Sequence, residues 1–344
     1  MPGLISTGLA NPNLTWEKIK ISNLGVDFSF LNRKLYGEID AFYRQRSGIP
    51  TTRITSLPST FGASLPPENL NSLNDRGFEF NLGTAGKMGE VSYDVSGNIS
   101  WARAEWDHFE EPEYTDKDQK SIYQRSGQWI DRNVGYLSDG LFTSQSQIEK
   151  LNFDQDLQGN KTLRPGDVRY KDVNGDGKLD WKDQVDIGKG NIPHWMLGFN
   201  TNLKYKNFDL SAVFQGAFGY YTYVNLASTL AGSTFYYDQR WTTTNNDPNA
   251  IIPRLGGAGT NGLFSDYYYK KSSYIRLKSA AVGYTMPKQW LNKIAFSQVR
   301  IYVAGTNLLT FSKLSKFGID PEAPNVGWYY PQQRTISFGV NVSF

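Results

Sequence analysis

The last ten residues of the chain, 335–344, alternate strictly between apolar and polar or glycine residues. Successive side chains of a β-strand point to opposite faces, so this period of two gives one apolar face and one polar face. An apolar strand face needs lipid or a packed core beside it, and the strand edges need partner strands. The pattern therefore predicts a strand of a closed sheet with lipid on one side and a polar lumen on the other.

The same alternation recurs along the chain and predicts nine strands. It is clearest at 91–101, whereas 273–286 alternates poorly and is assigned partly from its β-branched and aromatic residues. The stretch 17–30 changes phase near Ser22, which indicates a bulge. The predicted strands are 17–30, 35–44, 74–85, 91–101, 197–205, 208–217, 273–286, 298–310 and 332–344.

The connections between these strands alternate between short and long. Short periplasmic turns and long outer loops are typical of outer-membrane barrels. The pattern predicts an all-β fold, an antiparallel up-and-down transmembrane β-barrel, and nine strands indicate part of a larger barrel because single-chain bacterial barrels have an even number. The short connections are 31–33, 86–89 and 206–207, with one of moderate length at about 287–297, and the long ones are 46–73, 106–192, 219–272 and 311–331.

Composition narrows the possible functions. The net charge of +3 gives no reason to expect a nucleic-acid partner. The absence of Cys excludes disulfides and thiolate chemistry, and two His leave little for a His-based centre. No apolar run is long enough for a transmembrane helix, and the first residues lack the pattern of a secretory signal. A barrel needs export, so we expect an amino-terminal part of the gene product to precede this chain.

Residues 172–183 have the spacing of the twelve-residue calcium loop of EF-hands. Gly177 stands where that loop turns sharply, and the last position is Asp where EF-hands have a longer Glu. An Asn-Gly and Asp-Gly turn without an ion is the alternative. The loop lies within the long connection 106–192, so a structural Ca²⁺ would stabilise an outer loop. The expected ligands are Asp172, Asn174, Asp176, the carbonyl of Lys178, Asp180 and Asp183.

Aromatic residues gather near the ends of the predicted strands. An aromatic girdle at the membrane interface explains this position, and stacking platforms for sugar rings are the other interpretation. The candidate substrate contacts are Trp241, Tyr268, Trp328 and Tyr329.

Two classes of protein other than a membrane barrel would account for some of these features. A secreted, calcium-stabilised carbohydrate-binding module would use the same aromatics and the same loop. A β-sandwich or propeller hydrolase would need a positioned pair of carboxylates, and the acidic cluster Glu110, Glu111 and Glu113 has the turn-like surroundings of a solvated loop. No nucleophile elbow, phosphate loop or zinc-protease motif is present, so the chain is not expected to be an enzyme.

Several stretches, taken in order, resemble the carboxy-terminal third of SusC/RagA-type TonB-dependent transporters of Bacteroidetes. The likeness covers nearly all of the chain, residues 1–344, and residues 166–177 (GDVRYKDVNGDG) resemble the family's loop motif. The other stretches are 11–18, 207–216, 273–278, 283–287, 299–308 and 330–339.

The resemblance implies an outer-membrane barrel of about 22 strands with an amino-terminal plug, of which this chain supplies about nine. It implies import of oligomeric nutrients, glycans or peptides, across the cell outer membrane. The implied partners are a SusD-like lipoprotein over the outer mouth, TonB acting through the missing amino-terminal part, and the lipid bilayer. The terminal Phe344 resembles the signal that the outer-membrane assembly machinery reads.

Overall fold

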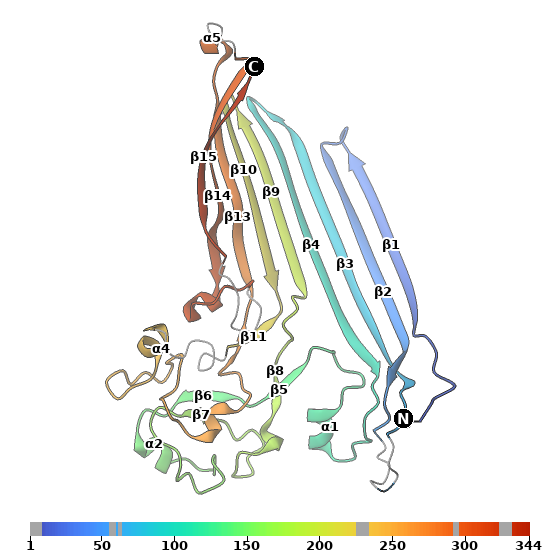
Figure 1. Cartoon of the computed structure of the whole chain (residues 1–344), viewed down its shortest axis with the longest axis vertical. Helices are drawn as coiled ribbons and strands as arrows, with labels where there is room; N and C mark the ends of the chain where they lie inside the picture. The colour runs from blue at the N-terminus through green and yellow to red at the C-terminus, as the bar shows by residue number, and fades with distance from the viewer. Residues whose placement is uncertain (1–8, 55–59, 61–63, 225–233, 292–295, 323–331) are drawn as a thin grey trace, which may run out of the picture. The chain divides into compact units, whose positions relative to one another are not determined.

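The computed structural model describes residues 9–54, 60, 64–224, 234–291, 296–322 and 332–344, and its main feature is a nine-stranded sheet (Figure 1). The strand order is β1-β2-β3-β4-β9-β10-β13-β14-β15, and the pairs from β4 onward are antiparallel. The predicted all-β class and all nine strands are confirmed. Their bounds are β1 Lys18–Phe30, β2 Leu35–Thr51, β3 Glu68–Met88, β4 Val91–His108, β9 Trp195–Tyr205, β10 Phe208–Phe218, β13 Tyr274–Thr285, β14 Gln298–Ser312 and β15 Thr335–Ser343.

Smaller elements fill the long connections. Three two-stranded sheets pair β5 with β8, β6 with β7 and β11 with β12. None of the helices within the described ranges is long and apolar enough to cross a membrane. The bounds are β5 Asn133–Gly135, β6 Ser138–Leu141, β7 Val168–Tyr170, β8 Val185–Gly188, β11 Tyr221–Tyr223, β12 Tyr269–Lys271, α1 Lys117–Tyr123, α2 Gln145–Glu149, α4 Thr234–Gln239, α5 Lys288–Leu291, and the 3₁₀ helices η2 Trp181–Asp183, η3 Gly259–Gly262 and η4 Lys313–Phe317.

The chain divides into two compact units, which are described separately. The first comprises Met1–Gly25, Asp40–Phe78 and Ala102–Arg132, and the second comprises Val26–Ile39, Glu79–Trp101 and Asn133–Phe344.

In the first unit, strands β2, β3 and β4 run further than the sequence predicts. Cross-strand ion pairs lie along or next to the added lengths: Arg53 Nε lies 2.8 Å from Glu68 Oε1, and Arg76 Nη2 lies 2.7 Å from Glu105 Oε2. The indole of Trp129 lies near two guanidinium groups, with Arg76 Cζ 4.8 Å from its ring centroid. Charged side chains interrupt the apolar pattern there, which is why hydrophobic alternation predicts strands that are too short.

In the second unit, the short connections lie together at one end of the strands, near the end of the chain (Figure 1). We call this the short-turn end, formed by residues 31–34, 87–90, 206–207 and the described parts of 286–297. The β1–β2 turn has Leu31, Asn32 and Arg33 with φ of 54°, 55° and 66°, which permits a tight reversal. The predicted separation of short and long connections is confirmed at these turns.

A β-bulge explains why 273–286 alternates poorly. The pairings of β13 with β10 and with β14 both shift register between Leu277 and Ser279. Lys278 has no partner on β10 and is therefore the extra residue on β13 relative to that strand. Ile275 before the bulge and Val282 after it are both exposed, at 39% and 53%. The inserted residue changes the parity of the apolar face, and no single period of two can describe the strand.

One face of the sheet exposes large apolar side chains. Val282 of β13, paired with Val303 of β14, and Phe338 of β15, also paired with Val303, are 53%, 43% and 81% exposed. The neighbouring residue Ala281 lies on the opposite face, paired with Ala304. An apolar row that continues across paired strands is what lipid-facing barrel strands present.

The largest cluster of buried hydrophobic residues lies outside the nine-stranded sheet, in the segments 133–190 and 234–272, which we call the loop module. This cluster gathers residues from both segments around Tyr170 and Trp241, which are 1% and 6% exposed. A second cluster is formed by Phe142, Ile148 and Leu163. The long connections are therefore folded with their own core rather than extended over a surface.

The two faces of β13 predict opposite responses to a charged substitution. Val282→Arg would place a guanidinium in hydrocarbon and reduce the free energy of unfolding in lipid vesicles by about 2–4 kcal/mol. Ala281→Arg, one residue away on the other face, is the matched control and is expected to cost much less. Urea titration in phospholipid vesicles measures both variants, and equal losses would contradict the assigned faces.

Candidate functional site

The calcium-type loop 172–183 folds around the carboxylate of Asp172. Its Oδ1 accepts a hydrogen bond from Gly175 N at 2.7 Å, and its Oδ2 accepts one from Gly177 N at 2.9 Å. Both glycines have left-handed φ, 73° and 86°, and an added Cβ would be strained there. Asn174 Oδ1 accepts from Asp176 N at 2.9 Å, so the first half of the loop is held by side-chain to backbone bonds.

The second half of the loop is fixed by Asp180 and Asp183. Asp183 is fully buried, and its Oδ1 and Oδ2 accept hydrogen bonds from Val173 N and Asp180 N, each at 2.8 Å. Burial raises the pKa of Asp183, although these donors oppose the shift. Asp180 Oδ2 lies 2.8 Å from Lys178 Nζ, and this contact lowers the pKa of Asp180. The residues predicted as ligands thus lie on one closed loop.

A second acidic loop lies beside the first and was not found from the sequence. Asp156 accepts four hydrogen bonds, from Gln158 N, Asn160 N and Thr162 N at 2.8 Å each and from Thr162 Oγ1 at 2.7 Å. Burial opposes ionisation of Asp156, but these donors together lower its pKa to about 2. Backbone bonds from Asp154 N to Gly177 O, 2.9 Å, and from Leu179 N to Asp154 O, 3.0 Å, join the two loops.

No three His, Cys, Asp or Glu side chains of the described ranges converge as a metal-holding group. The loop 172–183 is no exception to that statement. Its donor set also includes the amide oxygen of Asn174 and the backbone carbonyl of Lys178.

Asp167 connects three segments of the loop module. It is fully buried and pairs with Arg254, whose Nε lies 2.8 Å from Oδ1. Asn261 Nδ2 donates to Oδ1 at 2.9 Å, and Arg164 N donates to Oδ2 at 2.8 Å. A buried carboxylate with this many donors is compensated, and removing the donors would leave a costly charge. In the sequence, Asp167 stood out only as part of the stretch 166–177, and nothing there indicated that it joins these segments.

The structure separates the candidate substrate aromatics. Trp241 is 6% exposed, and its Nε1 donates to Asn246 Oδ1 at 3.0 Å, which favours a packing role in the loop module. Tyr268 is half-buried and contacts the rings of Tyr223 and Tyr267, with centroids 5.9 and 4.9 Å away. Trp328 and Tyr329 lie outside the described residues.

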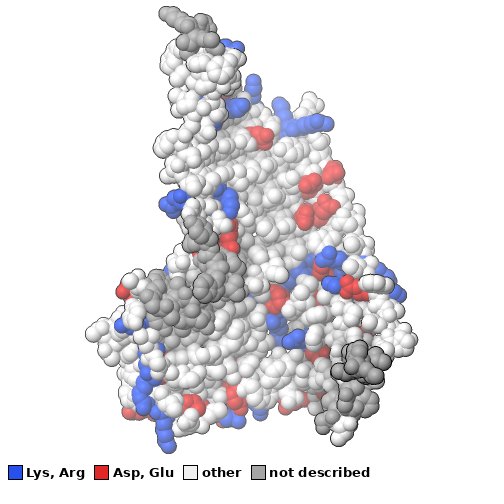
Figure 2. All heavy atoms as spheres, viewed as in Figure 1, with Lys and Arg blue, Asp and Glu red and all other residues white. Residues whose placement is uncertain are grey.

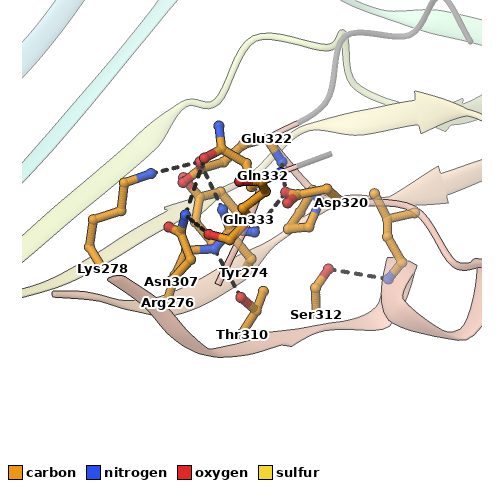
Figure 3. A network of polar contacts seen from close by, with 12 residues as sticks. Tyr274, Arg276, Lys278, Asn307, Thr310, Ser312, Asp320, Glu322, Gln332 and Gln333 are labelled. Atoms are coloured by element: carbon orange, nitrogen blue, oxygen red, sulfur yellow. Dashed lines mark hydrogen bonds and ion pairs between the residues drawn. The ribbon is translucent and has the colours of Figure 1, made fainter. Parts of the chain in front are cut away.

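The strongest polar network of the second unit surrounds Arg276 on β13 (Figure 3). Arg276 is 2% exposed, and its guanidinium donates to Thr310 Oγ1 at 2.9 Å, Glu322 Oε2 at 2.9 Å and Asp320 Oδ1 at 2.6 Å. Lys278 Nζ lies 2.9 Å from the same Glu322 oxygen. Two cationic side chains of one strand, two residues apart, thus reach one carboxylate.

The network holds the segment 313–322, which begins with helix η4. Its polar end is fixed by Arg276, and Tyr274 OH donates to Glu322 Oε1 at 2.9 Å. Its apolar end packs Leu314, 1% exposed, against Val224 and Ile252. The segment is therefore held from both sides, between strand β13 and the apolar residues near the loop module.

The sequence did not reveal this network, because its acidic members lie more than 40 residues from Arg276. The one available signal was a basic residue, Arg276, in the middle of an apolar strand pattern. Charged residues inside a barrel strand are expected to face the lumen or a partner.

Replacement of Arg276 by Met leaves Asp320 and Glu322 without their main partner. We expect loss of a compensated buried pair to cost about 3–5 kcal/mol locally and to speed hydrogen exchange across 313–322. Arg300→Met is the matched control, because Arg300 pairs with a carboxylate, Asp209, on the same sheet at a distance from this segment. Unchanged exchange of 313–322 in Arg276→Met would refute the clamping role.

No family model matches the chain. TonB-dependent receptor P3 of Formosa agariphila is 30% identical, over 99% of this chain and 36% of its own length. TonB-dependent receptor SusC of Bacteroides thetaiotaomicron is 26% identical, over 97% of this chain and 32% of its own length. The chain thus spans about a third of the length of the curated relatives it matches.

The solved structures support the same fold. The RagAB peptide transporter superposes with a TM-score of 0.67 at 20% identity, covering 98% of this chain and 36% of that one. The RagAB peptide importer in its open-open state gives a TM-score of 0.68. The chain is thus similar along nearly its whole length to TonB-dependent receptors that include SusC, and it shares its fold with the RagAB structures, which fits a carboxy-terminal portion of a SusC/RagA-type receptor.

Proposed function

We propose that this chain forms part of the barrel wall and outer loops of a TonB-dependent receptor that imports oligomeric nutrients across the outer membrane. The observation that supports the proposal best is the apolar face of the sheet, which is exposed across β13, β14 and β15. Relatives named as TonB-dependent receptors support the same class. A secreted carbohydrate-binding module, the alternative, would leave this apolar face in water.

The proposed cargo is a glycan or a peptide oligomer. RagAB is named as a peptide importer, which supports the peptide alternative, and the glycan alternative rests on the sequence resemblance to the SusC/RagA type. The proposed partners are a SusD-like lipoprotein at the outer mouth and TonB, which would act through another part of the receptor. Tyr268 is the proposed aromatic contact for a sugar ring among the described candidates.

The complete receptor is tested by uptake of labelled oligosaccharides and peptides in cells that also carry its lipoprotein partner. We expect uptake that stops when TonB is deleted or the proton gradient is dissipated. For a glycan cargo, Tyr268→Ala should weaken binding by about 2- to 10-fold, the size of a lost aromatic contact. Tyr205→Ala, at the short-turn end, serves as the control. Uptake that persists without the receptor or without TonB would contradict the proposal.

We also propose that Ca²⁺ binds the loop 172–183 and stabilises the loop module. The support is chemical, because the closed loop offers carboxylate, amide and carbonyl oxygens, which are the ligands a hard cation prefers. Asp172, Asn174, Asp176, Asp180 and Asp183 would supply side chains, and Lys178 its carbonyl. The terminal Asp183 is shorter than the usual Glu, so the proposed binding is weak.

Calcium should slow hydrogen exchange in 172–183 and raise the melting temperature, since a ligand that binds only the folded state stabilises it. Asp176→Ala should remove both effects. Asp139→Ala is the control, because Asp139 is a carboxylate of the same module that pairs with Arg169. A melting temperature that does not change with calcium or a chelator would rule out this site.

The terminal strand gives a further proposal about assembly. Phe344 is 90% exposed, and its ring centroid lies 5.3 Å from that of Phe296. We propose that this aromatic end is the part of the chain that the outer-membrane assembly machinery contacts.

A further inference from the structure

The short-turn end carries an unusual excess of basic side chains. The described residues of its connections contain five basic residues and one acidic residue, Glu90, whereas the whole chain is nearly balanced at 36 Lys and Arg against 33 Asp and Glu. All five basic side chains are exposed, and Figure 2 shows blue groups at this end of the strands. We call these residues the basic rim: Arg33, Lys34, Lys87, Lys206 and Lys288.

The basic rim directly follows the apolar ends of the strands. Phe30, Tyr205, Phe208 and Trp290 are 57%, 47%, 54% and 64% exposed at this end. Exposed aromatic side chains at strand ends form the girdle that lies at the level of lipid headgroups. Except for Lys87, the rim residues lie within a few positions of these aromatics in the sequence, so their charged groups are placed at that level or just beyond it.

Lys206 connects the girdle with the rim. Its Nζ lies 5.2 Å from the centroid of the Tyr205 ring, so the lysine leans over an exposed aromatic of the strand end. Its ion pair with Glu90 is 3.2 Å long and highly exposed, with side chains 57% and 64% exposed. Exposed pairs of this kind contribute little, and they leave the ammonium accessible to another anion. A lysine with its stem along apolar surface and its charge at the interface is the arrangement that places a cation beside headgroups.

We propose that the basic rim binds anionic phospholipid headgroups, such as phosphatidylglycerol, of the leaflet next to the short-turn end. The inference rests on the proposed function, because it requires the strands to cross a bilayer. Charge complementarity supports it, since clustered Lys and Arg at a membrane surface attract anionic lipids. The spread of the rim over four separate connections fits a ring of lipids better than one acidic peptide, which would need a local cluster.

The complete receptor is reconstituted into nanodiscs of phosphatidylethanolamine with a minor fraction of phosphatidylglycerol, then extracted, and its retained lipids are measured by native mass spectrometry. We expect phosphatidylglycerol to be enriched over its bulk fraction and the enrichment to fall with added salt. In the triple variant Lys34→Gln, Lys87→Gln, Lys206→Gln the enrichment of phosphatidylglycerol should fall at least fivefold, which is about the effect of losing one interfacial lysine.

The control is the triple variant Lys117→Gln, Lys150→Gln, Lys161→Gln, which removes the same charge from exposed residues of the long connections. It should keep the enrichment. An inserted receptor without enrichment, or equal enrichment in both triple variants, overturns the lipid inference but leaves the proposed function intact. Lysine-dependent binding of peptidoglycan fragments without lipid enrichment also overturns it. A complete receptor that does not insert at all overturns both proposals.

Discussion

The pairing of every backbone group within the sheet is the constraint on which the structure depends. Hydrocarbon offers no hydrogen-bond partner, so a strand in lipid must be paired on both edges by other strands. The nine-stranded sheet meets this requirement along its interior strands, and it turns its apolar face outward. For this reason the period-two pattern, and not a buried core, identifies the fold.

The largest packed cluster lies instead in the loop module, where the chain behaves like an ordinary folded protein. Its stability depends on buried polar groups with full sets of partners, of which Asp167 with Arg254 is the clearest. The Arg276 network performs the corresponding task for segment 313–322, next to strand β13. A surface built from long connections can keep a defined shape because such contacts, together with clusters such as Phe142 with Leu163, hold those connections in place.

The sequence predicts the strands because alternation is a local property that each strand shows by itself. It predicts the calcium-type loop for the same reason, since the spacing of 172–183 lies within twelve residues. The folded loop module, the bulge at Lys278 and the Arg276 network escape prediction because they depend on contacts between distant segments. The burial of Trp241 is also set by distant residues. The sequence alone therefore predicted both Trp241 and Tyr268 as substrate contacts and could not distinguish them.

The most direct test of the account is the environment of neighbouring residues on one strand of the sheet. This chain contains no Cys, so in a receptor whose other parts are also free of Cys, single cysteines introduced at Val303 and Ala304 of β14 take spin labels at defined places. In the complete receptor in lipid vesicles, the label at 303 should be reached by oxygen, which concentrates in hydrocarbon, and the label at 304 should not. A label at 303 that is reached instead by a water-soluble relaxer, or by neither reagent, would contradict the assignment of this face to lipid.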